Sequence, residues 1–145
     1  HLRTFPELPA EWRDDALAAK FETLRRLRRV VTGALEVERA ARRIGSSLQA
    51  HATAYVEPAY VEAAAGIDLA ELFITSGATL EAGPGPDTAF RIADVPGVAV
   101  VIVPAQGRKC ERCWQVLADV GRRPEHPDIC ERCADAVGGG LAAAE

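Results

Sequence analysis

The stretch KCERCWQVLADVGRRPEHPDICERC, residues 109–133, has the quartet Cys-Glu-Arg-Cys at both ends and holds all four cysteines of the 145-residue chain. Its pattern, Cys110-x2-Cys113-x16-Cys130-x2-Cys133, falls within the spacing class of four-cysteine zinc sites. Two tight turns that each present a pair of thiolates can close a tetrahedron around one ion. We therefore predict a zinc site with these four residues as ligands.

Other uses of the four cysteines stay open at this point. They could form two disulfides, which a cytosolic chain disfavours, or an iron site of the same geometry. His126 lies four residues before Cys130 and could replace one thiolate, although a histidine in such a place is more often exposed. Because four thiolates leave no open coordination position, we expect the zinc to be structural. Structural zinc contributes about 10 to 16 kcal/mol of apparent binding energy near neutral pH, which would hold a short segment with little apolar content.

The arginine inside each quartet has two possible roles. Four thiolates and one zinc ion sum to a charge of about −2, and Arg112 and Arg132 are placed to offset it, with Lys109 nearby. The same arginines could instead point outward to phosphates or base edges. Trp114, directly after the first quartet, could pack on the rest of the chain or stack on an unpaired base. Spacing alone favours packing for the tryptophan and leaves the direction of the arginines undecided.

Residues 14–44 carry apolar side chains at three- and four-residue steps, which predicts one long helix. Acidic residues at its start and Arg42 and Arg43 at its end are favourable to the helix dipole. Gly45 follows directly and suits the left-handed conformation that ends many helices. At about 45 Å, such a helix outruns a small core, so we expect it to belong to a helical bundle. Its stripe consists of Leu17, Phe21, Leu24, Leu27, Val31, Ala34, Leu35, Ala41 and Ile44.

After this helix the apolar period changes to two residues, which is typical of β-strands. A short helix is expected at 58–65, where proline lies in the first turn, and a further turn at 68–72. The run GVAVVIVPA at 97–105 is continuously apolar and β-branched, as in a central strand. Strands are expected at 48–56, 72–80, 88–95 and 97–105.

These patterns predict an α+β fold with a long N-terminal helix, a small mixed αβ layer of about four strands and a C-terminal four-cysteine zinc ribbon. We divide the chain into the helix at 1–46, the αβ subdomain at 47–107, the zinc-binding module at 108–136 and a tail at 137–145. The chain begins with His1 and contains no methionine, so we expect a fragment or a processed chain.

Charge is distributed unevenly along the chain. The formal net charge of −4 argues against a wholly basic nucleic-acid binder. Residues 16–50, however, carry eight basic and three acidic side chains, whereas residues 51–107 carry one basic and seven acidic ones. A positive helix beside an acidic body can still meet a polyanion locally. No window reaches the ~18 to 20 apolar residues of a membrane span, so we expect a soluble cytoplasmic protein without a membrane partner.

Several motifs resemble a known family. KCERCW at 109–114, ADVG at 118–121 and HPDICERC at 126–133 look like the terminal zinc motif of bacterial isoleucyl-tRNA synthetases. FP at 5–6 and LRRLRRVVTGALEVERAARRIGSSLQA at 24–50 agree with that family in the same order. The chain is similar to the C-terminal region of that family over nearly its whole length. The ending VGGGLAAAE departs from the Gly-Glu-x-Arg ending of the family and has no assigned role.

The resemblance implies that this region recognises the anticodon end of isoleucine tRNA and does no chemistry. A distant catalytic domain, absent from this chain, would activate isoleucine with ATP and charge the tRNA. The chain has neither the HIGH-like nor the KMSKS-like nucleotide motif, and we predict no catalytic residue in it. Residues 14–44 would be the last helix of the anticodon-binding bundle. The implied partners are isoleucine tRNA, through its anticodon stem-loop, and the rest of the parent synthetase.

A single-stranded anticodon loop exposes base faces and edges, which an aromatic ring and arginines can contact. The resemblance thus makes a contact role for Trp114 as reasonable as packing. The helix arginines fit a solvated or phosphate-facing surface better than base recognition. The residues we expect to bind tRNA are Trp114, Arg112, Arg132, Lys109, Arg39, Arg42 and Arg43.

Two other classes of protein remain as alternatives. Formamidopyrimidine-DNA glycosylases end in a related four-cysteine hairpin that binds DNA, but this chain lacks their helix-two-turn-helix signals and their N-terminal Pro-Glu start. A zinc ribbon that binds only other proteins is the third class.

Overall fold

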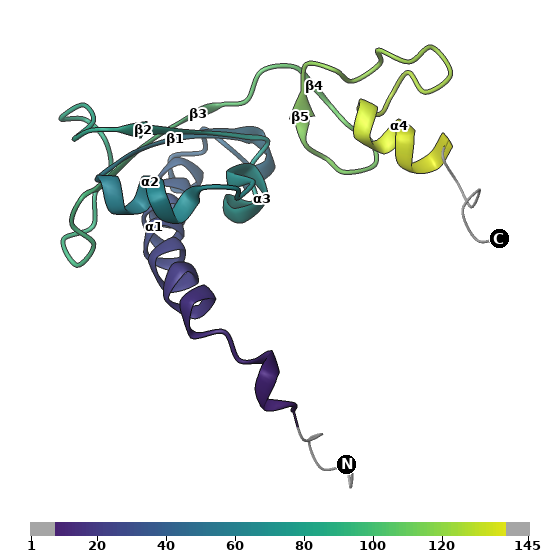
Figure 1. The fold of residues 1–145 in the computed structure, drawn as a ribbon. Helices are drawn as coiled ribbons and strands as arrows, with labels where there is room; N and C mark the ends of the chain where they lie inside the picture. Colours follow the sequence, from purple (N-terminus) through teal and green to yellow (C-terminus); the bar gives the residue numbers. More distant parts are fainter. Residues whose placement is uncertain (1–7, 139–145) are drawn as a thin grey trace, which may run out of the picture.

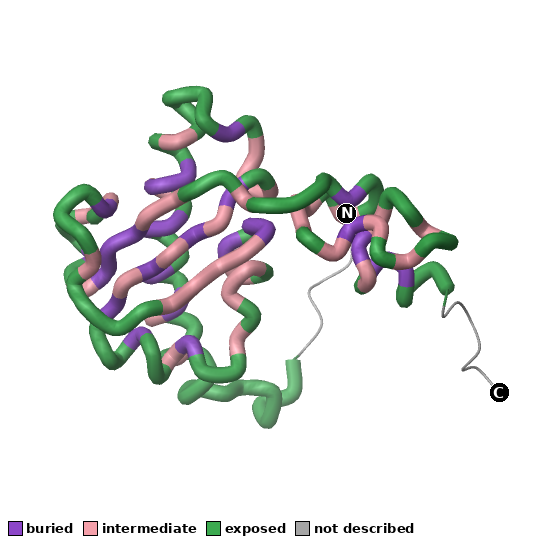
Figure 2. The backbone as a smooth tube through the Cα atoms, turned by 90° about the horizontal axis from the view of Figure 1, so that it is seen from above, coloured by how far each residue is buried: buried purple, intermediate pink, exposed green. Residues whose placement is uncertain are grey.

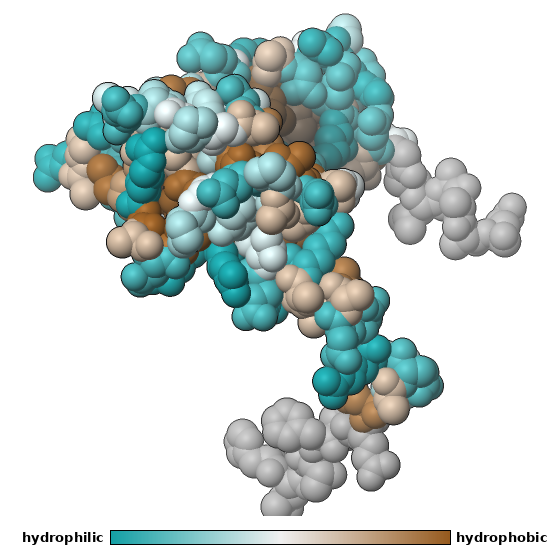
Figure 3. Space-filling view, turned by 60° about the vertical axis from the view of Figure 1, so that its left-hand side comes forward, coloured by the Kyte–Doolittle hydropathy of each residue, from teal (hydrophilic) through white to brown (hydrophobic). Residues whose placement is uncertain are grey.

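The apolar stripe forms α1 (Asp15–Ala40), preceded by a short 3-10 helix, η1 (Ala10–Trp12), in the computed structural model, which describes residues 8–138. The Asp14 carboxylate accepts a 2.8 Å hydrogen bond from the N–H of Leu17 and caps the first turn. The N-terminal half of α1 projects beyond the sheet (Figures 1 and 3), and Phe21 in that half is 36% exposed. The buried residues of α1 are Leu24, Leu27, Val30, Val31, Ala34 and Leu35.

The helix ends earlier than predicted, and Gly45 is not the residue that ends it. Arg42 takes the left-handed conformation instead, with φ of 57°. The N–H of Arg43 then donates to the carbonyl of Glu38 at 3.0 Å, which is the long hydrogen bond of a Schellman motif. The Arg43 side chain also pairs with the Glu38 carboxylate at 2.5 Å. Because these contacts lower the cost of the left-handed residue, a glycine is not needed there.

Three strands form a mixed sheet in the order β2-β1-β3, and the predicted α+β fold is confirmed. They are β1 (Ala50–Val56), β2 (Gly77–Ala82) and β3 (Val98–Pro104). The central strand β1 runs parallel to β2 and antiparallel to β3. Its alternate residues are buried, as predicted. The helices α1, α2 (Pro58–Ala64) and α3 (Leu69–Phe73) lie on one side of the sheet (Figure 1).

The layer has one strand fewer than the four expected. Residues 88–95 contribute an isolated bridge, in which Phe90 pairs with Val100. The predicted strand at 72–80 begins as part of α3, because Ile74 takes a left-handed φ of 57° and ends that helix before β2 starts.

The apolar run at 97–105 forms an edge strand, β3, and not the predicted central one. Its residues are nevertheless buried at the N-terminal end, where Val98, Ala99 and Val100 are at most 4% exposed. Contacts with α1 on one face and the Phe90 bridge along its free edge account for that burial. The run at 97–105 is therefore continuously apolar because α1 and the Phe90 segment cover this edge strand, and not because the strand is central.

A linker at 105–107 leads from β3 to the cysteine module, which lies to one side of the body (Figure 1). The module contains a two-stranded ribbon of β4 (Arg108–Lys109) and β5 (Val116–Leu117), followed by α4 (Glu131–Gly138). Asp119 caps α4 by accepting a 3.1 Å hydrogen bond from the N–H of Glu131. Gly121 has φ of 84°, and a Cβ there would lie 2.7 Å from the Pro127 carbonyl oxygen. The motif ADVG therefore shapes the turn that leads to the second quartet.

Body and module have separate hydrophobic cores, and Figure 2 shows buried segments within each of them. The core of the module consists of Cys110, Val120, Cys130 and Cys133. No helix within residues 8–138 is long and apolar enough to cross a membrane. The first part of the N-terminal segment, with the FP motif at 5–6, and the tail from residue 139 onward lie outside the described residues.

Candidate metal centre

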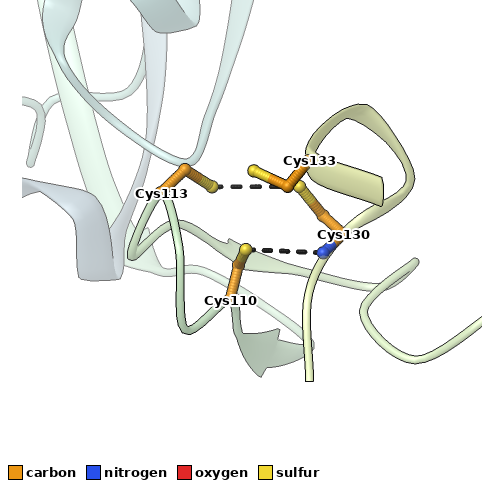
Figure 4. A group of neighbouring side chains, drawn as sticks. All are labelled: Cys110, Cys113, Cys130 and Cys133. Carbon is orange, nitrogen blue, oxygen red and sulfur yellow. Dashed lines mark hydrogen bonds between the residues drawn. The ribbon is translucent and has the colours of Figure 1, made fainter. Parts of the chain in front are cut away.

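The first quartet lies in a turn after β4 and the second opens α4, so that all four sulfurs come together and the predicted second turn is the start of a helix (Figure 4). The Sγ atoms of Cys110, Cys113, Cys130 and Cys133 lie within 4.8 Å of one another, and those of Cys113 and Cys130 are 3.8 Å apart. Four sulfurs at about 2.3 Å from a central zinc ion would be about 3.8 Å apart in a tetrahedron. The arrangement of these sulfurs, the cage, therefore fits tetrahedral zinc.

Two of the other uses of the cysteines find no support in this geometry. All four thiols are free, so the two-disulfide alternative does not hold. Among the described residues, the ligand group contains cysteines alone, and His126 is not part of it. His126 is half-buried, and its backbone N–H donates to the carbonyl of Arg123 at 2.9 Å, so it belongs to the loop before the second quartet.

The surroundings of the sulfurs explain why the cage needs a cation. Burial raises the pKa of the Cys110 thiol, but backbone N–H groups, including that of Cys130 at 3.4 Å, outweigh burial and lower the pKa to about 6. Burial and the neighbouring thiols raise the pKa of Cys130 to about 12. Burial likewise raises the pKa of Cys113. Burial and the neighbouring thiols thus oppose the thiolate form of Cys113 and Cys130, and a divalent ion between the sulfurs would offset this cost.

The arginine of each quartet faces a cysteine of the other quartet. The Nη1 atom of Arg112 lies 3.6 Å from the Sγ atom of Cys133. Hydrogen bonding to Cys113 raises the pKa of Arg132, whose Nη2 atom also donates to Gln115 Oε1 at 3.3 Å. Both guanidinium groups therefore lie where they offset thiolate charge, which is one of the two roles that the sequence left open.

Trp114 does not pack on the αβ body, since its side chain is 61% exposed. Its φ of 66° is uncommon for a bulky residue, and its N–H donates to the Cys110 carbonyl at 2.9 Å, so the cysteine turn imposes this conformation. The Lys109 ammonium lies 6.0 Å from the centroid of the indole ring. The module thus presents an aromatic face and a cation side by side to solvent.

The helix arginines form a second group at the C-terminal end of α1. Arg39 pairs with Glu36 at 2.5 Å, and Arg43 pairs with Glu38. Arg42 has no carboxylate partner within residues 8–138. No hydrogen bond or ion pair in that part of the chain joins these three arginines to the module, so the structure does not unite the two groups of predicted residues.

Three residues with a part in the site were missed by the sequence analysis. Asp119 caps α4 although it lies twelve residues before Glu131 in the sequence, whereas capping patterns involve residues next to the helix start. Gln115 and Ser76 connect the module to the body, through contacts between segments about 40 residues apart. Because glutamine and serine are common surface residues, the sequence carries no signal for this role.

Residues 107–136 match the family described as "Zinc finger found in FPG and IleRS". The two quartets and the cage therefore define a zinc-finger module of that class. Over 94% of its length, the chain is 48% identical to the isoleucine–tRNA ligases of Brucella abortus (strain 2308) and Agrobacterium fabrum, and 50% identical to that of Rhodopseudomonas palustris. It spans 14% of the length of each of these relatives. The resemblance to bacterial isoleucyl-tRNA synthetase is thus confirmed along almost the whole chain.

Proposed function

We propose that this chain is the part of an isoleucyl-tRNA synthetase that recognises the anticodon end of isoleucine tRNA. The similarity to isoleucine–tRNA ligases over 94% of the chain supports the parent enzyme. One observation supports the RNA-binding role: the Trp114 ring is exposed directly after the first quartet, and the Lys109 ammonium lies 6.0 Å from its centroid. ATP-dependent charging of tRNA in the cytoplasm belongs, on this proposal, to the rest of the synthetase.

Zinc holds the recognition module together in this proposal. Cys110, Cys113, Cys130 and Cys133 would be its four ligands, and the ion would cross-link the turn of the first quartet to the start of α4 without an open position for water. The module has a core of four buried residues, three of which are cysteines, so the metal replaces most of the hydrophobic stabilisation that a larger domain would have.

The charges around Trp114 suit an RNA loop. Stacking of a base on an aromatic side chain contributes about 1 to 3 kcal/mol. Lys109 and Arg112 have no carboxylate partner within residues 8–138, so they are available for phosphates. At the end of α1, Arg42 is available in the same way, whereas Arg39 and Arg43 are engaged with acids of their own helix. The other basic residues of the module pair with acids: Arg108, Arg122, Arg123 and Arg132.

A DNA-binding role is less well supported. The zinc finger at 107–136 belongs to a family named for both FPG and IleRS, so the module alone does not discriminate between DNA and tRNA. The body outside the module favours tRNA, because the similarity to isoleucine–tRNA ligases includes the body as well.

Fluorescence anisotropy with three labelled ligands tests the proposal. An isoleucine anticodon stem-loop, an unrelated stem-loop and an abasic DNA duplex are titrated with the zinc-loaded chain at several salt concentrations. We expect modest, salt-sensitive binding that favours the first ligand. Equal affinity for all three, or no binding at physiological salt, would argue against tRNA recognition by this chain.

A further inference from the structure

The orientation of the module depends on polar contacts. Body and module share no hydrophobic cluster in the described part of the chain, and a groove of about 320 Å³ separates the end of the sheet from β5. Thr75 and Ser76 are the two buried polar side chains among residues 8–138, and both lie in the turn between α3 and β2. Buried polar groups need partners. The Thr75 hydroxyl donates to the Gly77 carbonyl at 3.0 Å within the body, whereas the Ser76 hydroxyl has one partner in the body and one in the module.

Two hydrogen bonds join that turn to the segment after the first quartet. The Val116 N–H donates to Ser76 Oγ at 2.7 Å, and the Ser76 hydroxyl itself donates to the Leu48 carbonyl at 2.5 Å. The Gln115 side chain donates from Nε2 to the Thr75 carbonyl at 3.2 Å. The body therefore holds the module at residues 115 and 116, directly after Trp114.

Gln115 also contacts the cage. Its backbone carbonyl accepts the Cys110 N–H at 2.8 Å, and its Oε1 atom accepts from Arg132 Nη2 at 3.3 Å. Arg132 in turn reaches Glu71 of α3 through Nη1 at 3.4 Å. Gln115 thus forms hydrogen bonds with the turn of the first quartet, with Arg132 beside the sulfurs and with the body.

We propose that Gln115 is a positioning residue, which fixes the zinc module, and with it the Trp114 ring, against the α3–β2 turn. This inference rests on the proposed role of Trp114 in binding the anticodon loop. Without the side-chain amide, the Val116–Ser76 hydrogen bond and the exposed Arg132–Glu71 ion pair would remain, and the module would turn more freely about the linker at 105–107, where Gly107 has φ of 127°. The ring would then sample many directions. Stem-loop binding would be weaker, because fixing the ring in one direction costs conformational entropy.

The test uses Gln115→Glu in the whole zinc-loaded chain. A carboxylate keeps the shape and the acceptor toward Arg132, but it cannot donate to the Thr75 carbonyl. Gln106→Glu is the matched control, because Gln106 lies in the linker and its side-chain amide donates to the Pro104 carbonyl of the body at 3.5 Å. Zinc content and residual dipolar couplings by NMR are measured for each variant of this 15.5 kDa chain. Gln115→Ala is the second variant, should the added charge prevent folding.

We expect one zinc per chain in every variant. In the wild type and in Gln106→Glu, the couplings of body and module should fit a single alignment tensor, which here is called one frame. Gln115→Glu should give two different frames and bind the isoleucine stem-loop about three- to tenfold more weakly. A single frame in both Gln115 variants, or loss of zinc from them, would overturn the positioning role. Two frames with wild-type stem-loop affinity would also overturn it. If the wild-type chain binds no stem-loop, the proposed function fails, and the couplings still decide whether Gln115 positions the module.

Discussion

The guanidinium group of Arg112 lies 3.6 Å from the sulfur of Cys133, so the arginine of the first quartet contacts the last cysteine of the second. Arg132 has the reciprocal relationship, because hydrogen bonding to Cys113 raises its pKa. Each quartet therefore supplies a cation to the sulfurs of the other. This crossed arrangement gives a physical reason for an arginine at the same place in both quartets.

Arg112→Ala should weaken zinc binding by about tenfold, because it removes an N–H donor and a positive charge from the side of a thiolate. The affinity is measured by competition with a chromophoric zinc chelator. Arg122→Ala is the control, since Arg122 pairs with Glu131 at 3.5 Å within the module. Equal zinc affinity in the Arg112 variant and the wild type would contradict the crossed-charge account.

Removal of the metal should unfold the module and leave the body folded, because the two hydrophobic cores are separate. In ¹H–¹⁵N NMR spectra, a chelator should collapse the signals of residues 108–138 to unfolded positions while those of the sheet persist. Metal analysis of the pure chain should find one zinc ion. Iron in that analysis, or spectra unchanged by the chelator, would contradict a structural zinc site.

Trp114→Ala should weaken binding of the isoleucine stem-loop by about 1 to 3 kcal/mol, the contribution of one stacked base. Zinc content should stay at that of the wild type, because Trp114 is 61% exposed and is not one of the four ligands. Trp12→Ala is the matched control, since Trp12 is 72% exposed and lies at the other end of the described chain. Loss of zinc on replacing Trp114 would make it a residue that supports the cage.

Arg42→Gly should raise the free energy of unfolding by about 0.5 to 1 kcal/mol, because glycine adopts the left-handed φ of 57° without a Cβ penalty. If Arg42 contacts a phosphate, the same variant should also reduce the slope of log K against log salt concentration for stem-loop binding by about 1, because one counterion fewer is released. Chemical denaturation and anisotropy at several salt concentrations give the two quantities. Arg42→Lys keeps the charge and the strain, so both should stay at wild-type values. A destabilised glycine variant would contradict the role of Arg42 in ending α1.

Local patterns predicted the parts of the fold that depend on local rules. The period of two in Ala50, Ala52, Ala54 and Val56 is that of a strand with one buried face, and β1 has it. The cysteine spacing predicted that the four sulfurs would come together, and they lie within 4.8 Å of one another. The sequence did not predict that Arg42 would end α1, because the Glu38 contacts that stabilise its left-handed conformation form only once the helix has ended.

Contacts between distant segments could not be predicted in this way. An apolar run reads alike in a central strand and in an edge strand that other segments cover, so β3 was placed wrongly. The exposure of Trp114 depends on which side of the cage faces the body, and Gln115 and Ser76 decide that across about 40 residues of chain. Neither residue type marks such a contact in a single sequence.

The fluorescence of Trp114 in a Trp12→Phe chain tests the central claim most directly, because Trp114 is then the sole tryptophan. We expect the isoleucine anticodon stem-loop to quench this emission by base stacking, an unrelated stem-loop to quench it weakly, and chelation of zinc to abolish the difference. Binding of the isoleucine stem-loop by anisotropy without quenching, or equal quenching by both RNAs, would contradict an RNA-reading role for this zinc module.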